Sequence, residues 1–186
     1  STSFYAWITM ANSGLGPDVS ESPVMRNFAR YYMQLMKPVD PRWGIRILLN
    51  EGDTRPGSSP MPGILATMFK DTDPDLAGQL MQIWIEGGRD MTGGMGIPDA
   101  VIIDRRIEPR TPKLGPEVFP GFGAFLRYRE LGTPQEAYLA FLGGNFMIDH
   151  TNVDQLAFAW TEKGVPLSVF TGDMYVPGAI TALSHN

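Results

Sequence analysis

The spacing of apolar residues changes part-way along this chain, and that change constrains the fold more than any other feature. Up to about residue 88, apolar side chains recur with the spacing of one face of an α-helix. From about residue 100, short apolar or alternating runs are separated by glycine or proline, which is typical of strands. Helices followed by strands predict an α+β protein, with a helical layer joined to an antiparallel sheet.

Local signals place the individual elements. Ser22 and Pro23 form a capping pair at the start of one helix, and Asp73 precedes the proline that opens another. The predicted helical segments are 4–10, 23–37, 62–69 and 74–88. A short apolar run covers 101–103, and strands are predicted at 119–128, 137–142, 156–160 and 166–170, with a hairpin turn at 161–164.

A glycine-rich stretch, 87–96, separates the two patterns. It has the composition of a phosphate-binding loop, but it lacks the Gly-Lys-Ser/Thr ending and a preceding strand. A flexible connection is the favoured interpretation. The domains are therefore predicted as 1–99, mainly helical, and 100–186, mainly strands.

Composition excludes several classes of partner. The net charge is −5 and no block of lysine and arginine occurs, so neither a nucleic acid nor a membrane surface is expected as a partner. The chain has no cysteine, which excludes disulfides and thiolate metal sites. Its 43% apolar content is enough for a substantial core. The way the chain starts and stops suggests an excerpt from a larger protein.

His150 is the first candidate for chemistry. It is one of two histidines, and it lies between Asp149 and Asp154, directly before a predicted strand. Histidine has the unperturbed pKa closest to neutral pH, which suits proton transfer. The alternative is a structural histidine that is hydrogen-bonded to one of the two aspartates.

An ordered series of segments surrounds this histidine. It comprises a strand ending in Arg127, an apolar strand ending in glycine, the His150 motif, and a hairpin ending Gly-x-Pro-Leu. The series resembles the heparinase II/III-like polysaccharide lyases. The Gly52-Asp53-Thr54 loop and the helices after it resemble the last turns of that family's α/α toroid. The resemblance implies the C-terminal part of a toroid-like domain at 1–99 and the N-terminal part of an antiparallel β-sandwich at 100–186.

The resemblance also implies a function, which is cleavage of a uronic-acid-containing polysaccharide by β-elimination. His150 and Tyr5 would share the proton transfers, while Arg127, Asn152 and Tyr175 would contact the acidic substrate. Part of the site would come from the remainder of the parent chain, and a periplasmic or secreted location is implied. A purely structural role stays open for two of these residues. Tyr5 suits an aromatic core position, and Arg127 suits a structural salt bridge.

No cofactor is expected. Many members of the family hold zinc through a second histidine and an aspartate, but these positions are Asn152 and Phe170 here. Neither side chain is a good zinc ligand. Asp173 could replace the aspartate only with a shifted hairpin register, so no zinc is predicted.

Two further functions remain as alternatives. One is a non-catalytic relative that binds acidic glycans or serves as structure. The other is a hydrolase that uses Glu51 and Asp53 as its carboxylate pair, although a turn role explains Asp53 better. Arg42, Arg46 and Arg55 flank the same loop; they could meet a polyanion, but scattered charges of this kind usually form a solvated surface.

Overall fold

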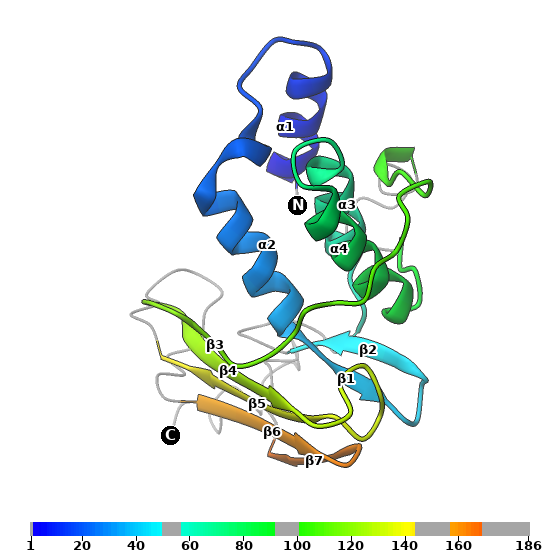
Figure 1. Ribbon diagram of the computed structural model, residues 1–186, viewed down its shortest axis with the longest axis vertical. Helices are drawn as coiled ribbons and strands as arrows, with labels where there is room; N and C mark the ends of the chain where they lie inside the picture. The colour runs from blue at the N-terminus through cyan, green and yellow to red at the C-terminus, as the bar shows by residue number, and fades with distance from the viewer. Residues whose placement is uncertain (1, 50–56, 92–100, 144–156, 169–186) are drawn as a thin grey trace, which may run out of the picture. The chain divides into compact units, whose positions relative to one another are not determined.

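The chain forms two compact units in a computed structural model that describes residues 2–49, 57–91, 101–143 and 157–168 (Figure 1). The first unit comprises 1–36 and 58–113, and the second comprises 37–57 and 114–186. This division differs from a single boundary after residue 99. Residues 37–57, from the half predicted to be helical, belong to the second unit. Residues 100–113, from the half predicted to form strands, belong to the first unit.

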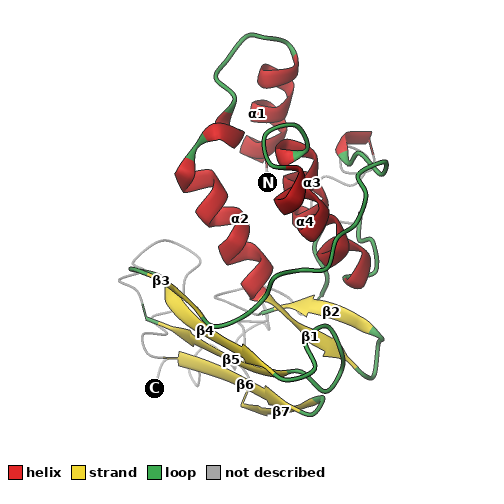
Figure 2. Ribbon diagram, in the orientation of Figure 1, coloured by secondary structure: helices red, strands yellow, loops and turns green. Residues whose placement is uncertain are grey.

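The first unit is built from helices (Figure 2). All four predicted helical segments form helices, and a 3-10 turn lies between the first two. The elements are α1 (Thr2–Asn12), η1 (Val19–Glu21), α2 (Pro23–Leu35), α3 (Met61–Phe69) and α4 (Pro74–Glu86). Helices α3 and α4 pack against each other, and Ile64, Phe69 and Leu80 are fully buried. The toroid expected from the resemblance is not confirmed by these helices. Of the helices in the described segments, none combines the length and apolar character needed to cross a membrane.

Helix α4 begins after the predicted capping aspartate. One carboxylate oxygen of Asp73, Oδ1, accepts a hydrogen bond from the N–H of Leu76 at 3.1 Å, as an N-cap does. The other oxygen accepts from the guanidinium of Arg26 in α2. A single carboxylate therefore caps one helix and ties it to another.

Replacing Asp73 with alanine is expected to lower the free energy of unfolding by about 1–2 kcal/mol, because a lost N-cap costs about 1 kcal/mol and a partly exposed ion pair contributes up to about 1 kcal/mol. Urea unfolding followed by tryptophan fluorescence measures the change. The Asp73→Asn variant keeps the cap and loses the charge, so it should retain most of the stability. If the alanine variant unfolds at the wild-type midpoint, the cap has no such role.

Residues 101–113 return to the helical unit instead of starting the sheet. The N–H of Asp104 donates to Thr67 Oγ1 in α3 at 2.9 Å, and the N–H of Arg110 donates to the carbonyl of Gly78 in α4 at 2.9 Å. A Cβ on Gly78 would lie 2.6 Å from Arg110 Cγ, so only glycine allows this close approach. The apolar run at 101–103 thus buries Ile103 in the first unit.

The second unit contains a five-stranded antiparallel sheet in the order β3-β4-β5-β6-β7 (Figure 2). Its strands are β3 (Glu117–Phe119), β4 (Gly123–Tyr128), β5 (Ala137–Leu142), β6 (Ala157–Glu162) and β7 (Val165–Ser168). The predicted strand 119–128 is two strands, because the N–H of Phe122 donates to the carbonyl of Phe119 and Gly121 has a φ of 82°. This tight turn reverses the chain between β3 and β4.

The turn between β6 and β7 is confirmed. Lys163 and Gly164 both have positive φ, 50° and 75°, as the central residues of a two-residue type I′ hairpin turn require. A Cβ on Gly164 would lie 3.0 Å from the carbonyl of Pro134 and 3.2 Å from Pro41 Cγ. The tip of this hairpin is therefore packed closely against two other segments of the second unit.

A second, two-stranded sheet in this unit was not predicted. Strands β1 (Met36–Asp40) and β2 (Ile45–Leu48) are joined by a turn in which the N–H of Gly44 donates to the carbonyl of Asp40 at 2.8 Å. Gly44 has a φ of 68°, a conformation that glycine adopts without strain. The strands are short and one carries an arginine, so their apolar pattern is weak.

The two faces of the five-stranded sheet differ in exposure. One face is buried through Phe125, Tyr138 and Ala140, each at most 2% exposed. The opposite face carries large apolar side chains that are 37–49% exposed: Leu126, Phe141, Phe158 and Trp160. Phe141 and Phe158 are register partners on β5 and β6. This alternation is the pattern of one sheet that can pack a second layer on its outer face.

Candidate functional site

Most of the residues predicted to carry the chemistry lie outside the described segments. This holds for the first-choice histidine, for the two predicted substrate contacts near it, and for the residues of the zinc and hydrolase arguments. They are His150, Asn152, Phe170, Asp173, Tyr175, Glu51, Asp53 and Arg55. Tyr5 lies within α1, and its side chain is not described. Their roles remain predictions.

The surroundings of His150 in the chain are described on both sides. Strand β5 ends at Leu142 and β6 begins at Ala157, and the two strands pair antiparallel from Tyr138↔Thr161 to Leu142↔Ala157. His150 therefore belongs to the connection between two neighbouring strands. The strand predicted to follow it, at 156–160, is confirmed with a shift of one or two residues.

Arg127 is not exposed to solvent. It lies in β4 opposite Tyr138 in β5, and its guanidinium carbon is 4.4 Å from the centre of the tyrosine ring. It donates a hydrogen bond to Glu136 Oε1, and both side chains are fully buried. The structural salt bridge, which was the alternative role for this arginine, is thus formed.

Arg46 reaches the same carboxylate from β2. Its Nη2 donates to Glu136 Oε2 at 3.2 Å, and its Nη1 donates to the carbonyl of Lys37 at 3.0 Å. The interpretation of Arg46 as a solvated surface charge is wrong, because its side chain is fully buried. Arg46, Arg127 and Glu136 form a buried ionic cluster that joins the β1–β2 hairpin to the large sheet. No sequence signal marked Glu136, since a glutamate directly before a strand usually lies in solvent.

The cluster holds Glu136 ionised. Burial raises the pKa of its carboxyl group, but the charges of Arg127 and Arg46 and the N–H of Gly132, at 2.9 Å from Oε2, lower it further than burial raises it. The net pKa lies below its ordinary value. A buried carboxylate with this many donors is satisfied in hydrogen bonding, as a buried charge must be.

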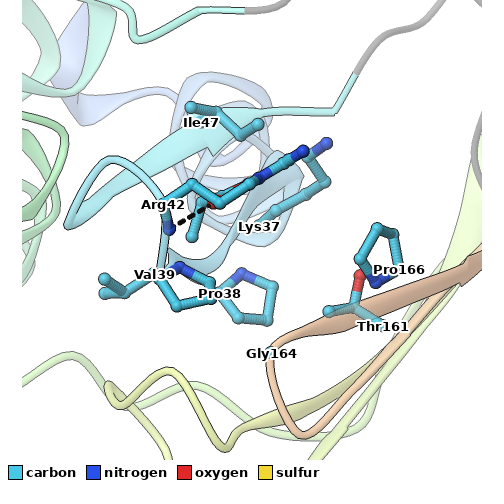
Figure 3. Close-up of a pocket in the computed structure, with 10 residues that line it drawn as sticks. Lys37, Pro38, Val39, Arg42, Ile47, Thr161, Gly164 and Pro166 are labelled. Atoms are coloured by element: carbon cyan, nitrogen blue, oxygen red, sulfur yellow. Dashed lines mark hydrogen bonds and ion pairs between the residues drawn. The ribbon is translucent and has the colours of Figure 1, made fainter.

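A small pocket lies elsewhere in the second unit, between the β1–β2 hairpin and the β6–β7 hairpin (Figure 3). Its volume is about 70 Å³. Apolar walls come from Pro38, Val39 and Ile47 on one side and Pro166 on the other, and Thr161 adds a hydroxyl group. The charged groups that line it are Lys37, Asp40 and Arg42.

Of the three charged side chains in this pocket, Arg42 and Asp40 form an ion pair with each other. Arg42 Nε and Nη2 donate to the two oxygens of Asp40 at 3.0 and 2.6 Å, and this bidentate pair lowers the pKa of Asp40. Burial lowers the pKa of Lys37, Asp40 opposes that effect, and the charge of Arg42 lowers it further. Within the part of the chain that the structure describes, the Lys37 ammonium forms no ion pair.

The first unit has a pocket of similar size, about 70 Å³. It is lined by Trp7 and Ile8 of α1 and by Lys70 and Asp71 at the end of α3, with Asp18 and Val19 nearby. Tyr5 belongs to the same helix, α1. Among the described residues, no group of three histidine, aspartate or glutamate side chains could hold a metal ion.

Comparison with known proteins gives a fold relationship only. No protein-family profile matches the chain, and no curated protein is similar to it in sequence. Among solved structures, the chain is similar to one described as heparinase III, the BT4657 gene product with methylated lysines, with a TM-score of 0.53 and 11% identity. The match covers 83% of this chain and 20% of that chain. At this identity the likeness shows a shared fold, and the chain spans about a fifth of the neighbour's length.

Proposed function

We propose that this chain is part of a polysaccharide lyase that cleaves a uronic-acid-containing polysaccharide by β-elimination. The observation that carries the proposal is the fold similarity to a heparinase III over 83% of the chain. The ordered segments around His150 in the sequence support the same reaction class. The enzyme would act as a carbon–oxygen lyase on an acidic polysaccharide outside the cytoplasm, in the periplasm or after secretion.

The reaction sets clear demands on side chains. A base removes the proton at C5 of the uronate, and the glycosidic oxygen at C4 leaves. Because the sugar carboxylate already carries charge, the site must neutralise it and stabilise the enolate that develops. His150 is the proposed proton carrier and Tyr5 its partner in the transfers. A free tyrosine has a pKa of about 10, so a nearby positive charge would have to favour its phenolate.

Substrate contacts in this proposal come from Asn152 and Tyr175. Arg127 has a different role, since its buried guanidinium is engaged by Glu136 and Tyr138. Groups that neutralise the sugar carboxylate would come from the remainder of the parent protein. The exposed apolar face of the five-stranded sheet suits one layer of the proposed β-sandwich.

No zinc is assigned to the reaction. An amide at Asn152 and a phenyl ring at Phe170 stand where a histidine and an aspartate would bind the metal, and neither group is a good zinc ligand. Elemental analysis of protein purified without chelators measures the metal content. Stoichiometric zinc would contradict this part of the proposal.

A non-catalytic protein that binds acidic glycans is the second candidate. The pocket with Lys37 and Arg42 favours it, because a site with more positive than negative charge attracts an anion without any need for catalysis. Sugar binding without cleavage is the property that would separate this candidate from the lyase.

Mass spectrometry of the products tests the lyase against both alternatives. The parent protein is incubated with alginate, heparan sulfate, chondroitin, hyaluronan and ulvan in turn. Elimination yields oligosaccharides that are one water lighter than the products of hydrolysis. A lyase therefore gives the lighter series on at least one polymer. Products with the added water would indicate the hydrolase, and intact polymer throughout would leave only the binding protein.

A further inference from the structure

The pocket between the two hairpins is a built feature of the second unit. One part of its lining is closely packed, since a Cβ on Gly164 at the hairpin tip would lie 3.0 Å from the carbonyl oxygen of Pro134 and 3.2 Å from Pro41 Cγ. Ile47 and Pro38 are buried, so the apolar walls are anchored in the core of the unit. Part of the lining is therefore held by the packing of the unit.

The charges that face this pocket are out of balance. Lys37 and Arg42 are cations, whereas Asp40 is the one carboxylate among the described residues that line the pocket. Asp40 is already committed to the bidentate pair with Arg42. The half-buried ammonium of Lys37 is thus left beside a second positive charge, and Figure 3 shows the two side chains extending in the same direction. An anion in the pocket would relieve this repulsion and replace water lost by Lys37.

Across the pocket, the described residues of the β6–β7 hairpin contribute no competing carboxylate to the lining. From the β6–β7 hairpin the pocket receives Thr161, Gly164 and Pro166. The nearest acidic residue in that hairpin, Glu162, accepts a hydrogen bond from Arg129 on another part of the unit. Thr161 instead offers a hydroxyl group, which can donate to an anionic oxygen.

The size of the pocket limits what can enter. Ligand sites that enclose a whole small molecule usually measure about 300–1,000 Å³, whereas this pocket measures about 70 Å³. On the same measure of volume a single water needs about 10–15 Å³, so the space fits a group with a few heavy atoms. Trp43 is 55% exposed, and the guanidinium carbon of Arg42 lies over its ring, 5.0 Å from the ring centre, so the rest of the ring offers an apolar surface outside the pocket. A sugar ring could rest there while its acidic substituent enters.

We propose that this pocket binds the acidic group of a sugar residue, a carboxylate or a sulfate, with Lys37 as the principal contact and Arg42 and Thr161 at its edges. The choice of a sugar as the carrier rests on the proposed function. The anion site itself rests on the lining charges and the pocket volume. Lys37 would bind and orient the substrate, and it takes no part in the proton transfers.

Nuclear magnetic resonance of the full 186-residue chain tests the proposal. Sodium glucuronate is titrated into the ¹⁵N-labelled protein at constant ionic strength, with glucose and inorganic sulfate as separate arms. The backbone amides of Val39, Arg42 and Gly164 are expected to shift with glucuronate and not with glucose. Shifts confined to other regions of the wild-type chain would overturn the proposal.

A matched pair of variants adds the second test. Lys37→Met keeps the aliphatic stem and removes the charge, and it should weaken glucuronate binding at least tenfold, as expected for one charged hydrogen bond. Lys113→Met removes the same charge from an exposed lysine of the first unit and should bind as the wild type does. Unchanged affinity in Lys37→Met would overturn the anion site. If inorganic sulfate binds as tightly as glucuronate, the assignment to a sugar is overturned.

These outcomes are separable from those of the lyase proposal. Binding is measured without turnover, whereas elimination is measured by the products. Glucuronate binding that depends on Lys37 in a protein that cleaves no polymer would overturn the lyase and keep the pocket. Cleavage by elimination, in a protein whose glucuronate affinity is the same with and without the Lys37 charge, would keep the lyase and overturn the pocket.

Discussion

Replacing Glu136 with glutamine is expected to lower the free energy of unfolding by about 3–5 kcal/mol, as the loss of one partner from a buried ion pair usually does. The reason is that Arg46 and Arg127 would remain fully buried with no carboxylate between them. Urea unfolding followed by tryptophan fluorescence measures the loss. Since small domains are stable by only about 5–15 kcal/mol, the variant should unfold at a much lower urea concentration.

Two comparison variants define what the cluster contributes. Glu162→Gln breaks the ion pair with Arg129, whose side chain is more than half exposed, and should cost at most about 1 kcal/mol. Replacing the whole cluster, with methionine at Arg46 and Arg127 and leucine at Glu136, should recover most of the loss because no buried charge is left unpaired. Equal effects for the two glutamine variants would contradict the account of the buried cluster.

The cluster also predicts how stability depends on pH. The pKa of Glu136 is lower in the folded chain than its ordinary value, so the unfolded chain takes up the proton first as the pH falls. The stability that the ionised carboxylate provides is therefore complete above its unfolded pKa of about 4.3, and it is lost as the pH falls through the lower folded value. Urea midpoints measured from about pH 7 down to about pH 3 should fall less steeply in Glu136→Gln than in the wild type.

Replacing His150 with alanine is expected to lower the rate of polymer cleavage by about 10²–10⁴-fold, which is the usual contribution of a positioned acid or base. Substrate binding should change much less, because the lost group acts on the proton in the transition state. The second histidine, His185, offers a matched control, and its alanine variant should cleave at the wild-type rate. If His150→Ala keeps its rate, the structural interpretation of this histidine is correct.

Local signals explain which parts of the fold could be predicted. Helices α2 and α4 each begin at a proline that follows a polar residue, and the β6–β7 turn needs only Lys163 and Gly164. These features depend on a few neighbouring residues, so the sequence reveals them directly. The type of element was predicted for all four helices, and the boundaries shifted by a few residues.

The parts that were missed depend on contacts between distant residues. The β1–β2 hairpin is held in the second unit by Arg46, whose partner Glu136 lies 90 positions further along the chain. Nothing near Arg46 in the sequence indicates that its charge is buried. Arg127 presented the same difficulty, since a strand-end arginine suits an acidic sugar and a buried carboxylate equally well. The pocket at Lys37 likewise needs two hairpins from different stretches of the chain.

Absorbance near the ultraviolet edge tests whether this chain serves cleavage by β-elimination. Elimination creates an unsaturated uronate that absorbs there, whereas hydrolysis and binding do not. With the parent protein and a uronate polymer that it shortens, we expect an absorbance increase that follows the appearance of new chain ends and is lost in His150→Ala. Shortening of the polymer without any rise in absorbance would contradict this expectation.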